Sequence, residues 1–298
     1  MAVRLIRGLE ELVPRYDGFI VDLWGVIHDG VAPFPGALEC LRSLKEAGKQ
    51  IVLLSNAPRR AEDVIRRIAA IGVPRAAYDD VMSSGEEAWQ HLSKLGRGRD
   101  GDSEDPFYDA LGRACLHIGS DRDMEIREGL DLDFVESPAA ADFILNTGPA
   151  GWEDTIEDYD PILRHAVGRD LPMVCANPDL VVMHGGRPAL CAGALAQHYE
   201  TIGGRVRWHG KPHRSVYDSC LDRLEVASTS RILTVGDSLR TDIAGAAAAG
   251  LDSLLIAGGI HAAEFGGGIN QALDLECVST ALDRAGLKPI GVARRFRW

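Results

Sequence analysis

A short apolar run that ends at an acidic residue constrains the fold of this chain more than any other feature. Residues 19–21 read Phe-Ile-Val and are followed by Asp22 and, three positions later, by Gly25. Such a run is typical of a strand buried on both faces of a parallel sheet. Ligands of open α/β sheets bind beyond the carboxyl ends of the strands, so Asp22 is a candidate nucleophile or metal ligand. The alternative is a polar residue that simply ends a strand.

Two further apolar runs end in polar residues in the same way. Residues 51–54 are followed by Ser55 and Asn56, and residues 231–235 are followed by Gly236 and Asp237. Apolar spacing and helix-starting residues predict helices over residues 35–47, 59–71, 210–224 and 239–249. The alternation of strands and helices predicts an α/β fold, with a Rossmann-like parallel sheet covered by helices.

The middle of the chain repeats this alternation in a separate unit. Strand-like runs at residues 115–118, 143–145 and 173–176 alternate with helical patterns at 86–95, 121–129 and 154–167. The helical pattern at 191–202 then returns the chain to the first unit. We therefore predict a core domain in two parts, residues 1–82 and 184–298, and an α/β domain inserted between them at residues 83–183.

Composition narrows the class of protein. Apolar residues make up 46% of the 298 residues, which is enough for a substantial core, and the formal net charge is −12. This acidity argues against a nucleic-acid partner, because phosphate backbones are bound through basic patches. No uncharged apolar run reaches membrane-spanning length, and charged residues stand where a signal peptide needs its apolar stretch, so we expect no membrane association.

The cysteines are scattered and form no Cys-x-x-Cys pair, which disfavours both a disulfide framework and a zinc cluster. Buried free thiols in a reducing cytoplasm are the simpler interpretation, so we expect a cytoplasmic protein. The six positions are Cys40, Cys115, Cys175, Cys191, Cys220 and Cys277.

The polar strand ends occur together with a lysine, Lys211, in a Gly-Lys-Pro helix start. Each feature alone has an ordinary explanation: Asp237 as a helix N-cap, Asp242 as a solvated helix residue, Lys211 as a surface charge. In this order, with a domain inserted between the second and third strands, the chain resembles the haloacid dehalogenase-like hydrolases. The resemblance is carried by residues 53–56, 176–179, 209–212 and 235–242.

More narrowly, the chain resembles class IIA of these hydrolases, which includes the NagD-like, pyridoxal phosphate and 4-nitrophenyl phosphate phosphatases. The resemblance implies a Mg²⁺-dependent phosphatase of small phosphorylated metabolites that forms an aspartyl-phosphate on Asp22. It implies that Mg²⁺ is held by Asp22, the backbone carbonyl of Trp24 and Asp237. Asp242 would orient a metal-bound water or pair with Lys211.

The resemblance also implies a set of phosphate-binding groups. Ser55 would hydrogen-bond the phosphoryl oxygens together with the backbone N–H groups of Asn56 and Ala57, and Lys211 would supply positive charge. The inserted domain would act as a cap that selects the substrate, and relatives of this class often pair through it as homodimers. Its turn from Asn177 to Asp179 would face the substrate, although an Asx-Pro turn is equally a structural device.

One residue departs from the family pattern. The position two residues after the nucleophile carries an aspartate in the phosphatases, where it protonates the leaving oxygen, and here it is Trp24. Indole is a weak donor and cannot shuttle a proton near neutral pH. Three functions stay open: a phosphatase that uses an activated leaving group or a substitute acid such as His28 or Asp29, a Mg²⁺- and phosphometabolite-binding regulatory protein, and a non-phosphatase hydrolase on the same scaffold.

Overall fold

The computed structural model describes residues 3–95, 105–184, 187–266 and 273–298, which form two compact units. The first, which we call the core unit, comprises Met1–Ser55, Val64–Met82 and Lys211–Trp298. The second, the inserted unit, comprises Asn56–Asp63 and Ser83–Gly210. Each unit has its own sheet and its own buried apolar clusters.

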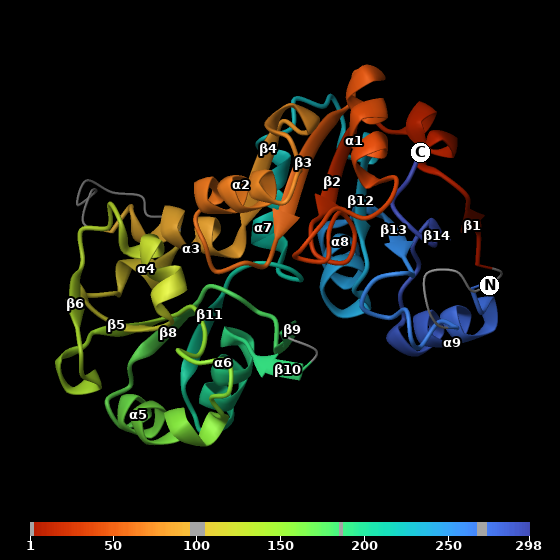
Figure 1. Ribbon diagram of the computed structural model, residues 1–298. Coiled ribbons are helices and arrows are strands. Elements are labelled where there is room, and N and C mark those ends of the chain that lie inside the picture. The colour runs from red at the N-terminus through yellow and green to blue at the C-terminus, as the bar shows by residue number, and fades with distance from the viewer. Residues whose placement is uncertain (1–2, 96–104, 185–186, 267–272) are drawn as a thin grey trace. The chain divides into compact units, whose positions relative to one another are not determined.

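The core unit is built on a seven-stranded sheet in the order β1-β14-β13-β12-β2-β3-β4 (Figure 1). The β2 strand pairs in parallel with β3 on one side and with β12 on the other, so the three strands expected to carry the site lie together. The predicted parallel sheet is confirmed. The strands are β1 (Leu5–Ile6), β2 (Gly18–Asp22), β3 (Gln50–Ser55), β4 (Asp80–Ser83), β12 (Ile232–Gly236), β13 (Asp252–Ile256) and β14 (Gly291–Ala293).

Helices flank this sheet because its strands are apolar on both faces. One cluster joins Ile20, Val52 and Leu54 of the sheet to α7 and α8, and another packs α9 against β13 and β14. The α-helices that flank it are α1 (Ala37–Glu46), α2 (Ala61–Ala70), α7 (Arg214–Leu221), α8 (Ala244–Ala249) and α9 (Leu275–Ala285). Short 3₁₀ turns are η1 (Leu9–Glu11), η2 (Val13–Arg15), η3 (Arg75–Ala77) and η6 (Thr229–Arg231).

The order of the strands places the site. From β2 the chain adds β3 and β4 on one side, and β12, β13 and β14 follow on the other. The direction in which successive strands are added to the sheet therefore reverses between β2 and β12. In open α/β sheets, ligands bind beyond the carboxyl ends of the strands at this switch point. Val21 pairs with Val235, which puts Asp22 and Asp237 at the same end of adjacent strands.

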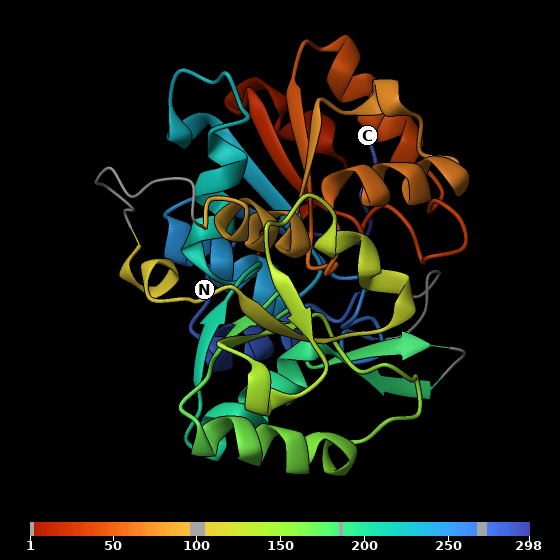
Figure 2. The same cartoon turned by 90° about the vertical axis from the view of Figure 1, so that its left-hand side faces the viewer.

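The inserted unit has a five-stranded sheet in the order β11-β8-β7-β5-β6, in which every pair is parallel. Helices α5 and α6 cover one face and α3 and α4 the other (Figures 1 and 2). The strands are β5 (Ala114–Ile118), β6 (Asp133–Val135), β7 (Phe143–Asn146), β8 (Pro172–Cys175) and β11 (Arg205–Trp208), with a hairpin of β9 (Val181–His184) and β10 (Arg187–Leu190). The helices are α3 (Ser84–Leu92), α4 (Pro106–Asp109), α5 (Ile156–Gly168) and α6 (Ala192–Thr201), with 3₁₀ turns η4 (Asp121–Arg127) and η5 (Pro138–Ala140).

The limits of the inserted unit differ from the sequence-based ones. The unit runs to Gly210 rather than to residue 183, and it also takes in residues 56–63. The boundary is corrected because β11 pairs along its length with β8, and because Leu195 and Tyr199 of α6 are buried in the cluster beneath the inserted sheet. The segment after residue 183 therefore completes this unit before the chain returns to the core.

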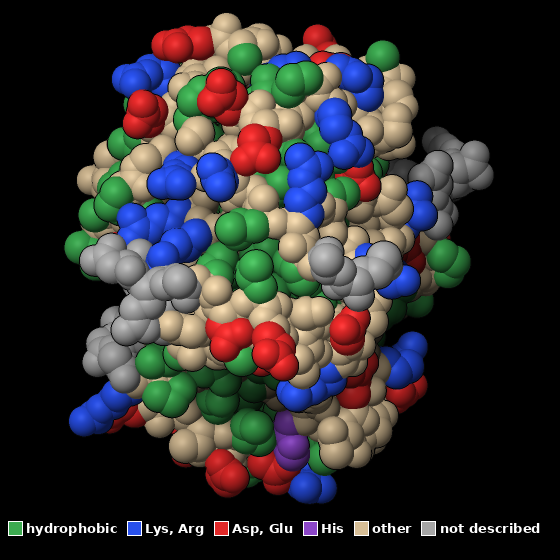
Figure 3. Space-filling view, turned by 90° about the vertical axis from the view of Figure 1, so that its right-hand side faces the viewer, with side chains coloured by type: hydrophobic (Ala, Val, Ile, Leu, Met, Phe, Trp, Pro, Cys, Tyr) green, Lys and Arg blue, Asp and Glu red, His purple; other side chains and the backbone are tan. Residues whose placement is uncertain are grey.

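The helix lengths, the cysteines and the surface charges can be compared with what the composition predicted. None of the helices in the described ranges is long and apolar enough to cross a bilayer. The six cysteines are free, and all are buried except Cys277, which is exposed on α9. On the face drawn in Figure 3, acidic and basic side chains are interspersed, so the excess of acidic residues does not gather there into one field of a single sign.

Candidate active site

Three carboxylates meet at the switch point of the core sheet. Asp22 ends β2, Asp237 follows β12, and Asp242 lies in η7 (Leu239–Ile243), a π-helical turn that leads into α8. One oxygen of each side chain lies within 4.8 Å of the others, and all three residues are buried. π-Helical turns are rare in proteins overall, but those that occur are often found at functional sites. Here the turn carries Asp242.

Lys211 lies among these carboxylates. Its Nζ donates to Asp22 Oδ1, to Asp242 Oδ1 at 2.8 Å and to the backbone carbonyl of Leu54 at 3.4 Å, and the residue is only 3% exposed. Burial alone would lower the pKa of Lys211, but the charges of Asp22 and Asp242 outweigh it and hold the pKa well above its usual value. The ammonium is therefore charged at every pH of interest.

Backbone groups fix the two aspartates that follow β12. The N–H of Ser238 donates to Asp242 Oδ2 at 3.1 Å, and the N–H of Ile260 donates to Asp237 Oδ2 at 2.6 Å. Glycines make room for Asp237, since a Cβ on either Gly25 or Gly259 would overlap its carboxylate. Gly25 also has a φ of +86°, which a residue with a side chain rarely adopts.

The charges of the cluster fit a divalent cation. Three carboxylates face one ammonium, which leaves an excess of negative charge in a buried place. Burial, opposed by Lys211 and reinforced by Asp242 and Asp237, raises the pKa of Asp22 well above its usual range, and burial together with Asp242 raises that of Asp237 to about 7. Carboxylate oxygens are the ligands that Mg²⁺ and Ca²⁺ prefer, so a cation held by Asp22, Asp237 and Asp242 would relieve this repulsion.

The remaining predicted residues of the core unit lie beside this cluster. Ser55 follows Leu54, whose backbone pairs with Asp22 and whose carbonyl accepts from Lys211. The side chain of Trp24 is half exposed, with 50% of its surface accessible. Its ring contacts the His28 ring edge-on, with the two ring centroids 5.7 Å apart. The role of the Trp24 carbonyl as a ligand stays a prediction, supported by the packing of the adjacent Gly25 against Asp237.

The other predicted substrate-binding residues form a group of their own in the inserted unit. The amide of Asn56 donates to Asp179 Oδ1 at 2.9 Å, and the backbone N–H of Asp179 donates to Asn177 Oδ1 at 2.9 Å. The carbonyl of Ala57 accepts from the backbone N–H of Gly85 at 3.1 Å. These bonds give the Asn-Pro-Asp turn a structural task, which is to hold the segment that follows β3. Contact of these residues with a substrate stays a prediction.

The two candidate substitute acids are not equipped for that role at neutral pH. Burial lowers the pKa of His28 to about 4, and its Nδ1 accepts from the N–H of Gly30 at 2.9 Å, so the ring is neutral. Asp29 is exposed, and its Oδ1 accepts from the N–H groups of Ala32 and Val31, which lower its pKa. A group that is ionised or lacks an acidic proton near pH 7 is a poor general acid.

Sequence reasoning missed three residues that support the cluster. Ile260 and Gly259 follow β13, the neighbour of β12. A Gly-Gly pair close behind a buried strand is the signal that marks such a close approach. Tyr217 of α7 is buried, and its hydroxyl donates to the backbone carbonyl of Asp242 at 3.1 Å. Nothing in its sequence context distinguishes Tyr217 from an ordinary core tyrosine.

We expect Lys211→Met to lower the free energy of unfolding of the metal-free protein by about 3–5 kcal/mol, because it leaves buried carboxylates without their cation. Lys49→Met is the matched control, since Lys49 forms an ion pair with Asp17 whose carboxylate is 41% exposed, and a pair of this kind contributes only about 0–1 kcal/mol. Urea unfolding at slightly alkaline pH measures both. Equal losses in the two variants would contradict the electrostatic role assigned to Lys211.

Comparison with known proteins agrees with the fold. A family model described as haloacid dehalogenase-like hydrolase matches residues 19–133, and a second model of the same kind matches residues 208–275. A crystal structure of a haloacid dehalogenase-like hydrolase from Brucella suis is 36% identical, with a TM-score of 0.80 over 98% of this chain and 99% of that one. The chain therefore belongs to the haloacid dehalogenase-like hydrolases.

Curated relatives narrow the class. The ribonucleotide monophosphatase NagD of Escherichia coli is 28% identical over 246 residues, which are 81% of this chain and 87% of that protein. Bovine chronophin is 28% identical over 279 residues, which are 87% of this chain and 88% of that protein. The chain is thus a hydrolase of the NagD-like class IIA branch, as the sequence motifs predicted.

Proposed function

We propose that this protein is a Mg²⁺-dependent phosphatase that hydrolyses a small phosphorylated metabolite through an aspartyl-phosphate on Asp22. The observation that carries the proposal is the buried cluster of Asp22, Asp237, Asp242 and Lys211 at the switch point of the sheet. The relatives named for hydrolysis of phosphate esters support the substrate class.

The residues of the chain divide the chemistry among them. Lys211 holds Oδ1 of Asp22, which orients the carboxylate for in-line attack on phosphorus. The bond from phosphorus to the leaving oxygen breaks as the bond to Asp22 forms, and water then releases phosphate and restores the carboxylate. Ser55 and Lys211 would bind the equatorial oxygens, on which negative charge is spread.

A divalent cation held by Asp22, Asp237, Asp242 and the Trp24 carbonyl would neutralise charge on the phosphoryl group and on the cluster. The chain orients these ligands through the backbone donors of Ser238 and Ile260. This fixed arrangement is what makes the cluster suitable for transfer of a dianionic group.

Trp24 sets the expected substrate preference. Without a proton donor two residues after the nucleophile, the leaving oxygen must depart as an anion or take its proton from water. Esters of acidic alcohols, such as phenols, then react far faster than alkyl phosphates. Neither His28 nor Asp29 changes this expectation, because the first is neutral and the second is held in a turn.

A panel of phosphate esters tests the proposal. With Mg²⁺ we expect release of phosphate from 4-nitrophenyl phosphate at a rate at least about 10²-fold above that from glycerol phosphates, which matches the lower range of a general-acid contribution. Chelation of the metal should remove both activities. No metal-dependent release from any ester would contradict the proposal.

A second function, binding of a phosphorylated metabolite without turnover, is favoured by the exposed indole of Trp24 in place of an acid. The two functions are separated by calorimetry on the same panel. A ligand that binds with Mg²⁺ but is not hydrolysed over hours supports the binding protein, whereas hydrolysis with turnover supports the phosphatase.

A further inference from the structure

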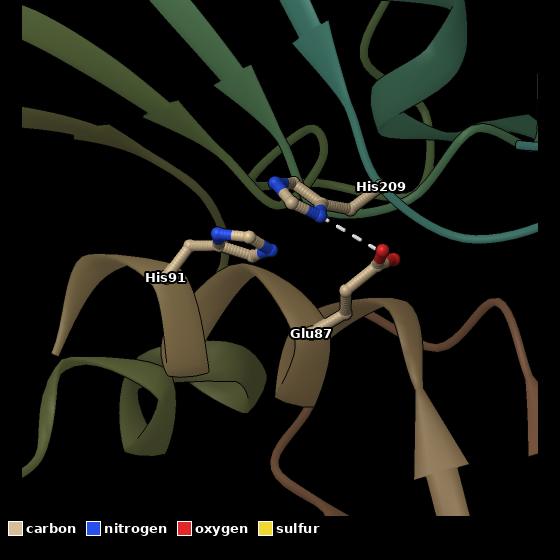
Figure 4. Close-up of side chains that lie close together, drawn as sticks. All are labelled: Glu87, His91 and His209. Atoms are coloured by element: carbon tan, nitrogen blue, oxygen red, sulfur yellow. Dashed lines mark ion pairs between the residues drawn. The ribbon is translucent and has the colours of Figure 1, made fainter. Parts of the chain in front are cut away.

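A second group of metal-ligating side chains lies in the inserted unit, apart from the aspartates of the core unit. It consists of Glu87 and His91 of α3 and His209, which follows β11 (Figure 4). One oxygen or nitrogen of each residue lies within 4.8 Å of the others. Glu87 and His91 are four residues apart, so they project from the same face of the helix.

Burial distinguishes this group from a surface cluster. Glu87 is 1% exposed and His209 is 2% exposed, whereas His91 is only partly buried. A carboxylate and two imidazoles are seldom placed together in an apolar core without a role, because the charged forms are costly to bury. The neighbouring residues Ala88, Leu92 and Tyr108 belong to the apolar cluster of this face.

The bonds around His209 leave one ring nitrogen directed at the group. Its Nε2 is hydrogen-bonded to the hydroxyl of Tyr108, which fixes the orientation of the ring. Its Nδ1 lies 3.3 Å from Glu87 Oε2, yet within the described residues it makes no hydrogen bond of acceptable geometry. In a metal-binding histidine one ring nitrogen binds the metal while an outer partner holds the other. With Nε2 held by Tyr108, the nitrogen of His209 available to a metal is Nδ1.

The carboxylate is also positioned by the backbone. Glu87 Oε2 accepts from the N–H of Gly210 at 2.8 Å, and Gly210 has a φ of +91° with no room for a side chain. Glu87 therefore joins the first turns of α3 to the last residues of the inserted unit. The group connects the segment where the chain enters this unit with the segment where it leaves.

We propose that Glu87, His91 and His209 form a binding site for a transition-metal dication of the Zn²⁺ class. Two imidazole nitrogens and one carboxylate oxygen are a ligand set typical of Zn²⁺ with one position open to water. The 3.3 Å between His209 Nδ1 and Glu87 Oε2 suits two ligands of one tetrahedral Zn²⁺ with bonds of about 2.0–2.1 Å, and His91 supplies the third ligand. Mg²⁺ is disfavoured because it prefers oxygen ligands.

Metal content after chelation and reloading tests the site. We expect the protein, after incubation with Zn²⁺ and gel filtration, to retain one Zn²⁺ per chain that Asp237→Asn does not remove. We expect His91→Gln to weaken Zn²⁺ binding by at least about 100-fold, the upper end of what loss of an outer-shell partner costs, and Tyr108→Phe by about 10- to 100-fold. Zn²⁺ should also raise the thermal midpoint by several degrees in the parent protein and not in His91→Gln.

His165→Gln is the matched control, because His165 is an exposed histidine of α5 in the same unit. It should retain Zn²⁺ like the parent protein. Glu87→Gln provides a second test if His91→Gln is poorly folded by circular dichroism, since the amide keeps the size of the side chain. If His91→Gln and Glu87→Gln both retain as much Zn²⁺ as the parent protein, or if only Asp237→Asn loses it, the proposal is overturned. Neither result would alter the function proposed for the core cluster.

Discussion

Replacement of Asp22 by Asn is expected to reduce the metal-dependent hydrolysis of 4-nitrophenyl phosphate by roughly 10⁴-fold or more, the scale of loss seen when a hydrolase loses its nucleophile. The amide cannot form the acyl-phosphate bond, and it also removes one of the carboxylates that would hold the cation. The measurement is the initial rate of 4-nitrophenol release with saturating Mg²⁺. Trapping of a phosphorylated chain in the parent protein but not in Asp22→Asn would locate the covalent step.

Asp29→Asn is the control for this experiment. Asp29 lies seven residues further along the same loop, is exposed, and uses its carboxylate to accept backbone N–H groups in a turn, which an asparagine can also do. We expect its activity to stay within about two- to threefold of the parent, as for a surface substitution. Comparable losses in the two variants would show that Asp29 takes part in the chemistry and would contradict its assignment as a turn residue.

Trp24→Asp is expected to increase the hydrolysis of alkyl phosphates by about 10²–10⁴-fold, the usual contribution of a general acid. Half of the Trp24 surface is exposed, so its replacement removes little core packing. The gain on 4-nitrophenyl phosphate should be much smaller, because that leaving group needs no proton. The ratio of kcat/KM for the two esters is therefore the informative measurement.

Trp24→Asn separates the acid from the removal of the indole. It opens the same space beside Gly30, whose backbone packs against the Trp24 ring, but its amide has no proton acidic enough to protonate a leaving group near neutral pH. If Trp24→Asn gains as much as Trp24→Asp, steric relief rather than acid catalysis is the cause. No gain in either variant would indicate that Trp24 is not what limits turnover.

Local pattern was sufficient for the strands that cross the centre of the core sheet. The runs ending at Asp22, Ser55 and Asp237 are mostly apolar because β2, β3 and β12 are buried along nearly their whole length. Edge strands lack this signal. Arg205–Trp208 alternates basic and apolar residues because β11 lies at the edge of its sheet, so the strand and the end of the inserted unit were missed.

Of the candidate site, the sequence predicted the residues at strand ends but not the groups that orient them. Asp22 and Asp237 end adjacent parallel strands, so the order of strands brings them together once the fold class is known. The partners that orient them, among them Ile260 and Tyr217, contribute backbone groups or a hydroxyl whose direction depends on how β13 and α7 pack. Periodicity carries no information about such directions.

The sequence by itself determined the α/β class, the order of the motifs, the identity of the carboxylates and lysine, and the absence of an acid at Trp24, because these depend on residue types and on local spacing. Only the tertiary structure decided that one lysine is shared by two buried aspartates, that His28 and Asp29 are unsuited to replace the acid, and that His209 meets Glu87 and His91. Each of these depends on contacts between segments far apart in the chain, formed by parallel pairing and burial. The sequence showed which residues carry charge and reactive groups, but not which residues lie next to them in the folded chain.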